Sequence, residues 1–287
     1  MKLALTALLA ASVTIPLAAQ NPTQPAALLR IFCERIKEGR EKAHETVETK
    51  FAVAVRRAKF PWGVLGMDAV TGSNDVWFIQ PLDSFADLQK EWDAYDKAAA
   101  MKAEMQTLEG QDGEQRVSGR TWLAQYRPAM SYRPGDFITA LPKMRLVHVT
   151  VIRVKPGYDN VVHEIARLGI GALNKAGDER PLLTYQVTSG DSNTYLLFRA
   201  SADWASLDKG EEQTRAIFAA MGDDVKKYVG MAREALVSEE SLTFALNPNT
   251  SAVSKAFADG DPAFWNPTPA VAPKKAAAKS EKPATAK

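Results

Sequence analysis

Histidine, cysteine and a few charged residues on predicted strands are the side chains of this sequence that could do chemistry. The chain has three histidines, His44, His148 and His163, and one cysteine, Cys33. A neutral imidazole can accept a proton or bind a haem iron, and a thiolate is a nucleophile when a base lies beside it. No such base adjoins Cys33, which lies in an apolar alternation typical of a buried residue.

The familiar catalytic and metal-binding motifs are absent from the sequence. It has no GxSxG, CxxC or HExxH run, and the three histidines have no metal-ligand spacing. Gly169-Ile-Gly171 lies inside a helical pattern, so it does not predict a dinucleotide loop. We therefore expect no metal site and name no catalytic residue. We expect His44 and His163, each followed by Glu, to occupy solvated helix positions.

Alternation along two predicted strands supplies the candidate binding residues. In Arg145 to Lys155, three valines at every second position form one face, which we expect to pack against helices. The other face would then line a cavity, as would the matching face of Leu28 to Lys37. The resulting ligand-binding candidates are Arg30, Phe32, Glu34, His148, Thr150 and Ile152. The alternative is a filled barrel in which Arg30 pairs with Glu34 and His148 makes a hydrogen bond.

An internal repeat organises the region between the two chain ends. Arg35-Ile-Lys-Glu-Gly39 matches Arg153-Val-Lys-Pro-Gly157, and Phe85-Ala-Asp-Leu88 matches Trp204-Ala-Ser-Leu207, at a nearly constant offset close to 119. Each copy has a pattern of strand, helix, two strands joined by a Gly/Ser/Asn turn, helix and strand. That order predicts the α+β fold class, with two ferredoxin-like βαββαβ repeats packed sheet to sheet as one intrachain barrel.

This pattern of elements resembles the dimeric α+β barrel superfamily, which includes NIPSNAP-like and antibiotic-biosynthesis-monooxygenase-like domains. The repeated Arg-x-Lys-x-Gly runs and the strand-then-helix segments Val76 to Leu88 and Tyr195 to Leu207 carry the resemblance. It implies two units whose sheets enclose a cavity, and it implies monooxygenase-like or haem-dependent chemistry in some members. The Trp, Asn and His set that some of its oxygenases use does not match positions in this sequence.

The two ends of the chain differ in composition from the rest. Residues 1–20 have a positive start, an apolar run and small residues, which predict a signal peptide and an exported, periplasmic or secreted protein without a transmembrane anchor. We place repeat 1 at 21–133, a linker at 134–143 and repeat 2 at 144–258. Residues 259–287 are predicted to be a disordered tail rich in Pro, Ala and Lys.

The net charge of +2 belongs to these ends. Lys2 contributes one positive charge, and the segment from Pro267 holds five lysines against one glutamate, so the body between them carries −3. The body therefore gives no support to nucleic-acid binding, while the tail could contact anionic surfaces. The leading hypothesis is an exported barrel that binds a small apolar or aromatic molecule. The alternatives are a haem-dependent or cofactor-independent oxidoreductase with His148 and Arg30 in the cavity, and an envelope protein acting through its tail.

Overall fold

A computed structural model describes residues 24–58 and 62–266 of the chain. The predicted signal peptide and residues 267–287 of the predicted tail lie outside the described residues. No helix among the described residues is long and apolar enough to span a membrane.

Eight antiparallel strands close into one barrel, with the order β1-β3-β2-β8-β5-β7-β6-β4. The pairs β2–β8 and β4–β6 join the two halves of the chain, and each half has the order 4-1-3-2 of a ferredoxin-like unit. The strands are β1 (Leu28–Ile36), β2 (Leu65–Ala69), β3 (Asp75–Leu82), β4 (Arg116–Tyr126), β5 (Leu146–Val154), β6 (Leu183–Ser189), β7 (Thr194–Ser201) and β8 (Leu236–Leu246).

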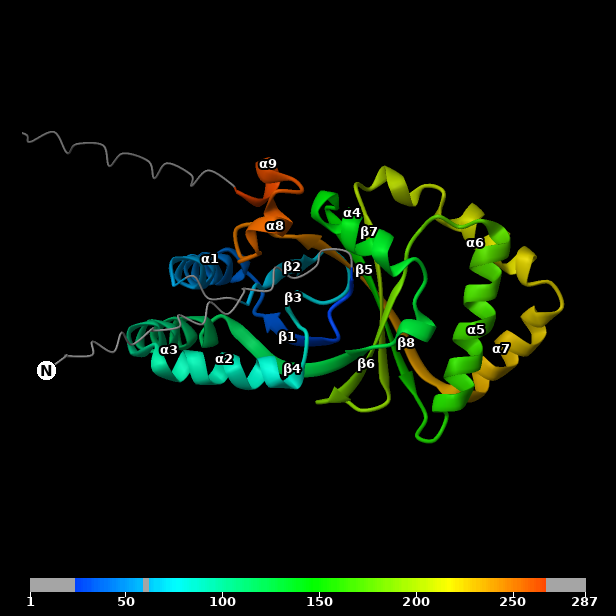
Figure 1. The fold of residues 1–287 in the computed structure, drawn as a ribbon, viewed down its shortest axis with the longest axis horizontal. Helices are drawn as coiled ribbons and strands as arrows, with labels where there is room; N and C mark the ends of the chain where they lie inside the picture. Colours follow the sequence, from blue (N-terminus) through cyan, green and yellow to red (C-terminus); the bar gives the residue numbers. More distant parts are fainter. Residues whose placement is uncertain (1–23, 59–61, 267–287) are drawn as a thin grey trace, which may run out of the picture.

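Helices cover the outside of the barrel on two opposite sides (Figure 1). The first group is α1 (Glu41–Arg57), α2 (Phe85–Lys97) and α3 (Ala99–Gly113), and the second is α5 (Asp159–Ala176), α6 (Gly210–Met221) and α7 (Asp224–Ala235). Short helices α4 (Pro134–Ala140), α8 (Lys255–Ala258) and α9 (Pro262–Trp265) gather at one end of the barrel. The α+β fold class and the barrel are thus as predicted.

Local chemistry explains where these elements start. Gly39 and Gly157 have positive φ angles of 75° and 84°, which let the chain turn sharply from β1 into α1 and from β5 into α5. Ser84 caps α2, because its side chain accepts a hydrogen bond from the backbone N–H of Asp87. The helix therefore begins at Phe85.

The two halves correspond element by element. β5 begins 118 positions after β1, and α5 begins 118 positions after α1. At the far end, Ile36 pairs with Arg116 and Val154 pairs with Leu236, so the last strands correspond at an offset of 120. His163, which follows His44 by 119 positions, is consequently one residue away from the structural counterpart of His44. The structural counterpart of His44 is Val162.

The barrel interior is the largest apolar core among the described residues. Trp77 and Trp122 meet edge to face with ring centres 5.5 Å apart, and Phe244 lies 4.9 Å from Trp77. Val149 in β5 and Ile31 in β1 also belong to this core and are fully buried. The valine face of β5 therefore points into the barrel and not toward the helices, opposite to the sequence expectation.

Two predicted boundaries also change. The predicted linker 134–143 contains α4 and a 3-10 turn, Leu141–Lys143. The chain stays ordered past 259, because Trp265 of α9 is only 4% exposed and donates a hydrogen bond from Nε1 to the Pro142 carbonyl oxygen at 2.7 Å. An indole buried with its N–H satisfied fixes this segment against the folded body.

Candidate functional site

A cavity of about 660 Å³ occupies the end of the barrel beneath the short helices. Interior strand residues form its floor and sides, and residues of α4, the following turn and α8 form its outer wall. We call α4, this turn (Leu141–Lys143), α8 and α9 together the cap. A single chain thus builds the apolar hollow that the sequence predicted, although different residues line it.

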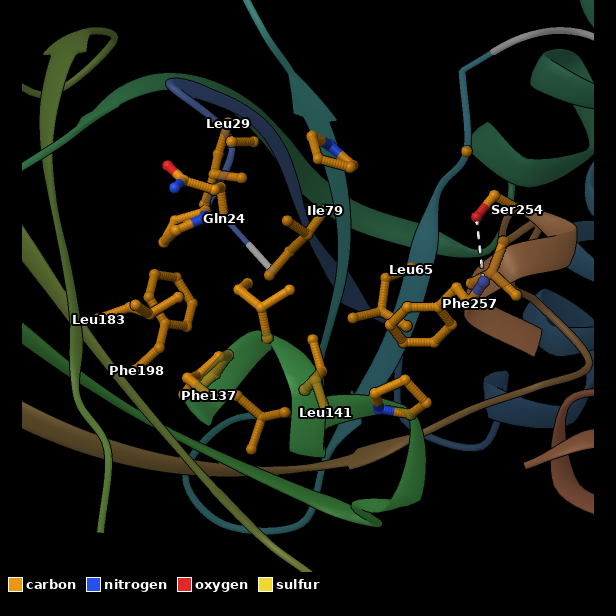
Figure 2. Close-up of a pocket in the computed structure, with 18 of the residues that line it drawn as sticks. Gln24, Leu29, Leu65, Ile79, Phe137, Leu141, Leu183, Phe198, Ser254 and Phe257 are labelled. Atoms are coloured by element: carbon orange, nitrogen blue, oxygen red, sulfur yellow. Dashed lines mark hydrogen bonds between the residues drawn. The ribbon is translucent and has the colours of Figure 1, made fainter. Parts of the chain in front are cut away.

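Figure 2 shows that this lining is almost entirely apolar. Strand residues and cap residues face the same space. Those labelled are Leu29, Leu65, Ile79, Leu183 and Phe198 from the strands, and Phe137, Leu141 and Phe257 from the cap. Surfaces of this kind bind small molecules mainly by removing apolar area from water.

The polar groups at the cavity are few and mostly already bonded. Tyr185 donates its hydroxyl hydrogen to the Ala26 carbonyl oxygen at 2.9 Å, and burial raises the pKa of this phenol. Ser254 accepts a hydrogen bond from the backbone N–H of Phe257 at 3.2 Å (Figure 2). Gln24 and Asp83, which are exposed, lie at the cavity edge. The cavity therefore presents an apolar surface with little charge.

The candidate residues of β1 do not line this cavity. Arg30 donates from Nη2 to Glu91 Oε1 of α2 at 2.6 Å, and its guanidinium lies 5.0 Å from the Phe32 ring centre. Phe32 packs in a small outer cluster, and Glu34 bonds to His44 of α1. The predicted inward orientation of these three residues is wrong, and Arg30 does not pair with Glu34.

The candidates of β5 lie on the same outer face. His148 shares hydrogen bonds from Nδ1 with Thr243 Oγ1 at 3.0 Å and from Nε2 with Ser201 Oγ at 3.2 Å. Ile152 packs in a cluster that includes α5 residues, and Thr150 Oγ1 lies 3.5 Å from Ser241 Oγ. The inward orientation expected for these three residues is also wrong. Closing the barrel places the apolar β-branched face inside, where side chains must fill it.

A haem ligated by His148 does not fit this arrangement. Both ring nitrogens of His148 have partners outside the barrel, and no histidine or cysteine lines the cavity among the described residues. An axial imidazole is thus missing where a haem could be enclosed. The proposed pairing of His148 with Arg30 in one site fails for the same reason.

A buried carboxylate–histidine cluster, which sequence reasoning missed, lies between β1, α1 and α3. It consists of Glu34, His44, Glu48 and Asp112, and one ligand atom from each residue lies within 4.8 Å of the others. Burial, reinforced by the neighbouring carboxylates, raises the pKa of Glu48 to about 9 and that of Asp112 to about 6. His44, expected to be solvated, is 2% exposed, whereas His163 is exposed as expected.

Different signals could have identified these two sites. The run Phe137-Ile138-Thr-Ala-Leu141 is too apolar for a free linker, and this feature pointed to a packed cap. His44 and Glu48 are four positions apart and so share a helix face, but Glu34 and Asp112 are distant in sequence. Only the packing of α1 and α3 on β1 brings the four together.

Known structures resemble this chain over most of its length. An anthrone oxidase-like protein matches with a TM-score of 0.49 and 15% identity over 79% of this chain and 94% of that one. A chlorite dismutase variant from Candidatus Nitrospira defluvii in complex with cyanide matches with a TM-score of 0.49 and 11% identity over 80% and 94%. No protein-family model and no curated protein matches the sequence. The strand order of the chain itself shows two ferredoxin-like sheets closed into one α+β barrel.

Proposed function

We propose that this protein binds a small apolar or aromatic molecule in the cavity at the capped end of its barrel. The observation that carries the proposal is the hollow of about 660 Å³, walled by apolar residues from both halves of the chain and from the cap. A cavity of this size falls in the range that holds small organic ligands. Burying the ligand's apolar surface contributes roughly 25 cal/mol per Å² before the costs of association are counted.

The geometry favours binding over catalysis at this cavity. Tyr185 is neutral and hydrogen-bonded to the backbone, and the carboxylate at the cavity edge, Asp83, is exposed. General acid–base chemistry needs a titratable group positioned against the ligand with a pKa near the working pH. The oxidoreductase alternative through Arg30 and His148 has no support from their positions, since both lie outside the barrel.

A thermal-shift panel on the full chain tests ligand binding. Indole, 1-naphthol and decanol represent aromatic, fused aromatic and aliphatic ligands, and a ligand present at about 100 times its Kd adds about 2.7 kcal/mol of stability. The variant Leu141→Trp narrows the cavity, and Leu207→Trp changes an exposed leucine that does not line it.

We expect at least one ligand to raise the Tm of the wild type and of Leu207→Trp, and to have a smaller effect on Leu141→Trp. If no ligand shifts the wild type, or if Leu141→Trp responds as the wild type does, the proposal fails. Isothermal titration on the same three proteins gives the stoichiometry, which should be one ligand per chain.

We also propose export through residues 1–20, contact of the basic tail with anionic surfaces, and descent of the two halves from a duplicated unit. Support for the first two comes from composition alone. Support for the duplication comes from the sequence repeat and the nearly constant offset, 118 to 120, between corresponding elements. Cell fractionation of the full chain and of a chain ending at 266 would test export and tail contact separately.

A further inference from the structure

Four potential metal ligands converge between β1, α1 and α3, outside the barrel and away from the apolar cavity. Glu34 comes from β1, His44 and Glu48 lie one turn apart on α1, and Asp112 comes from α3. All four residues are at least nine-tenths buried, with exposed fractions of 2% to 8%. The carboxylate–histidine cluster is thus held by three packed elements and not by a surface loop.

The spacing of the ligand atoms suits a small coordination sphere. His44 Nε2 lies 2.9 Å from Glu34 Oε2 and 3.2 Å from Asp112 Oδ1, and Glu48 completes a set within 4.8 Å. Metal–ligand distances of about 2.1 Å place ligand atoms roughly 3 to 4.2 Å apart. Side-chain adjustments of less than an ångström would therefore bring the four atoms onto one ion.

Two groups in the cluster have unmet hydrogen-bonding capacity. Glu48 is 8% exposed and makes no hydrogen bond to any residue that the structure describes. Asp112 Oδ1 is a buried oxygen without a hydrogen-bond partner among the described residues. Leaving a carboxylate oxygen buried and unsatisfied is costly, so Asp112 Oδ1 indicates a missing partner on the inner side of the cluster.

Arg116 holds one oxygen of each of two carboxylates in the cluster and leaves the other oxygen of each directed inward. Arg116 donates from Nη1 to Glu34 Oε1 at 2.6 Å and pairs through Nε with Asp112 Oδ2 at 2.7 Å. These contacts leave Glu34 Oε2 and Asp112 Oδ1 directed at His44. A cation bound between these two oxygens and Glu48 would give them a partner, and Arg116 would orient two of its ligands.

The second half of the barrel shows that the fold does not need charges here. The residues 118 positions after Glu34, His44 and Glu48 are the apolar Ile152, Val162 and Ala166. The residues 120 positions after Asp112 and Arg116 are the apolar Ala232 and Leu236. All except Ala232 pack in one apolar cluster. The polar set of the first half thus calls for an explanation other than packing.

We propose that Glu34, His44, Glu48 and Asp112 bind one divalent first-row transition-metal ion of the Zn²⁺ or Mn²⁺ kind. An imidazole nitrogen with carboxylate oxygens suits these ions, whereas Mg²⁺ prefers oxygen ligands and retains its water. His44 binds through Nε2 as the neutral imidazole with its proton on Nδ1, and binding releases any protons that the carboxyl groups hold. Arg116, whose side chain is 20% exposed, separates the site from solvent.

The test uses the full chain, stripped with EDTA and then titrated by calorimetry with Zn²⁺, Mn²⁺ or Mg²⁺ alone. We expect Zn²⁺ or Mn²⁺ to bind at one ion per chain and to raise the Tm, with Mg²⁺ weaker by at least about 10-fold. Because outer-shell changes alone cost about 10- to 100-fold in metal affinity, Glu48→Gln and Asp112→Asn should each weaken binding by more than about 10-fold. Glu164→Gln, which changes a carboxylate on α5 outside the cluster, is the control and should bind as the wild type does.

Circular dichroism establishes that each variant is folded. Glu48→Gln keeps the shape of the side chain and replaces a buried carboxyl group with a neutral amide, so this variant should fold without metal about as stably as the stripped wild type. Loss of binding in a folded Glu48→Gln supports the site. Absence of stoichiometric binding by either transition ion to the wild type would overturn it, as would binding that Glu48→Gln and Asp112→Asn leave unchanged.

Discussion

Cys33 lies inside the barrel, with 6% of the residue exposed, and no disulfide is available to it because it is the chain's one cysteine. Burial raises the pKa of its thiol from about 9 to about 12, and nearby Arg120 only partly offsets this effect. Since the thiolate is the reactive form, three pKa units reduce its population by about 1000-fold near neutral pH. Cys33 is thus a structural residue.

We predict that an aromatic disulfide reagent will label native Cys33 at least about 1000-fold more slowly than the unfolded chain at the same pH. The measurement is the absorbance change on labelling, with and without urea. Labelling of the native protein at the rate of the unfolded chain would show that the thiol is accessible and contradict the burial.

His148 makes stability depend on pH with a definite sign. Burial, and next the nearby Arg199, lower the pKa of this imidazole in the folded protein below its ordinary value of 6.5. Above that pH both states hold a neutral imidazole. Below it, the unfolded chain takes up a proton more readily than the folded protein does, so stability falls as pH falls.

We therefore expect the free energy of unfolding of the wild type to decrease relative to that of His148→Gln between about pH 7 and about pH 5. Urea unfolding of both proteins across this range measures the difference, and other titrating groups cancel because both proteins share them. If the free energies of unfolding of the two proteins change in parallel with pH, the folded protein does not disfavour the charged form of the His148 imidazole.

At the scale of the element, alternation along β1 and β5 predicted the strands correctly but assigned their faces the wrong way round. Period-two patterns show which residues share a face and do not show which face is inside. The helix side of β1 carries Arg30 and Glu34, which α2 and α1 satisfy with Glu91 and His44. Those partners are distant in sequence, so the charged face looked like a cavity lining.

Substitutions at two neighbouring positions of β5 should distinguish its inner face from its outer face by their effects on stability. Val149 is fully buried inside the barrel, and Thr150 lies on the outer face near Ser241. We expect Val149→Asn to cost more than about 2 kcal/mol, because it buries an amide without partners. Thr150→Asn should change stability by less than about 1 kcal/mol. Chemical denaturation gives both values, and equal costs would contradict the assigned faces.

At the scale of the whole molecule, the order of elements in each half was enough to predict a barrel from one chain. The repeat and the strand–helix–strand–strand pattern required two similar sheets, and joining them through β2–β8 and β4–β6 removes every sheet edge. The cap was not predictable in the same way. Its helices α8 and α9 have four residues each, too few for a periodic pattern, and they form by packing against α4 and its turn.

Trp265 tests whether this cap closes the cavity. Its ring meets Phe257 at 5.0 Å and Phe264 at 4.8 Å, and Phe257 forms part of the cavity wall. Removing a buried indole usually costs about 3 to 5 kcal/mol. If the cap unfolds only together with the barrel, Trp265→Ala should lower the free energy of unfolding of the whole protein by this amount. The exposed Trp204 supplies the control, since Trp204→Ala should cost less than about 1 kcal/mol.

The effect of Trp265→Ala on ligand affinity shows whether the cap encloses the ligand or only stabilises the fold. Loss of the indole removes the support behind Phe257, so any ligand that stabilises the wild type should bind Trp265→Ala more weakly and dissociate from it faster. Isothermal titration and stopped-flow dissociation measure the two changes, with Trp204→Ala again as the control. Unchanged affinity with reduced stability would mean that the cap stabilises the fold without enclosing the ligand.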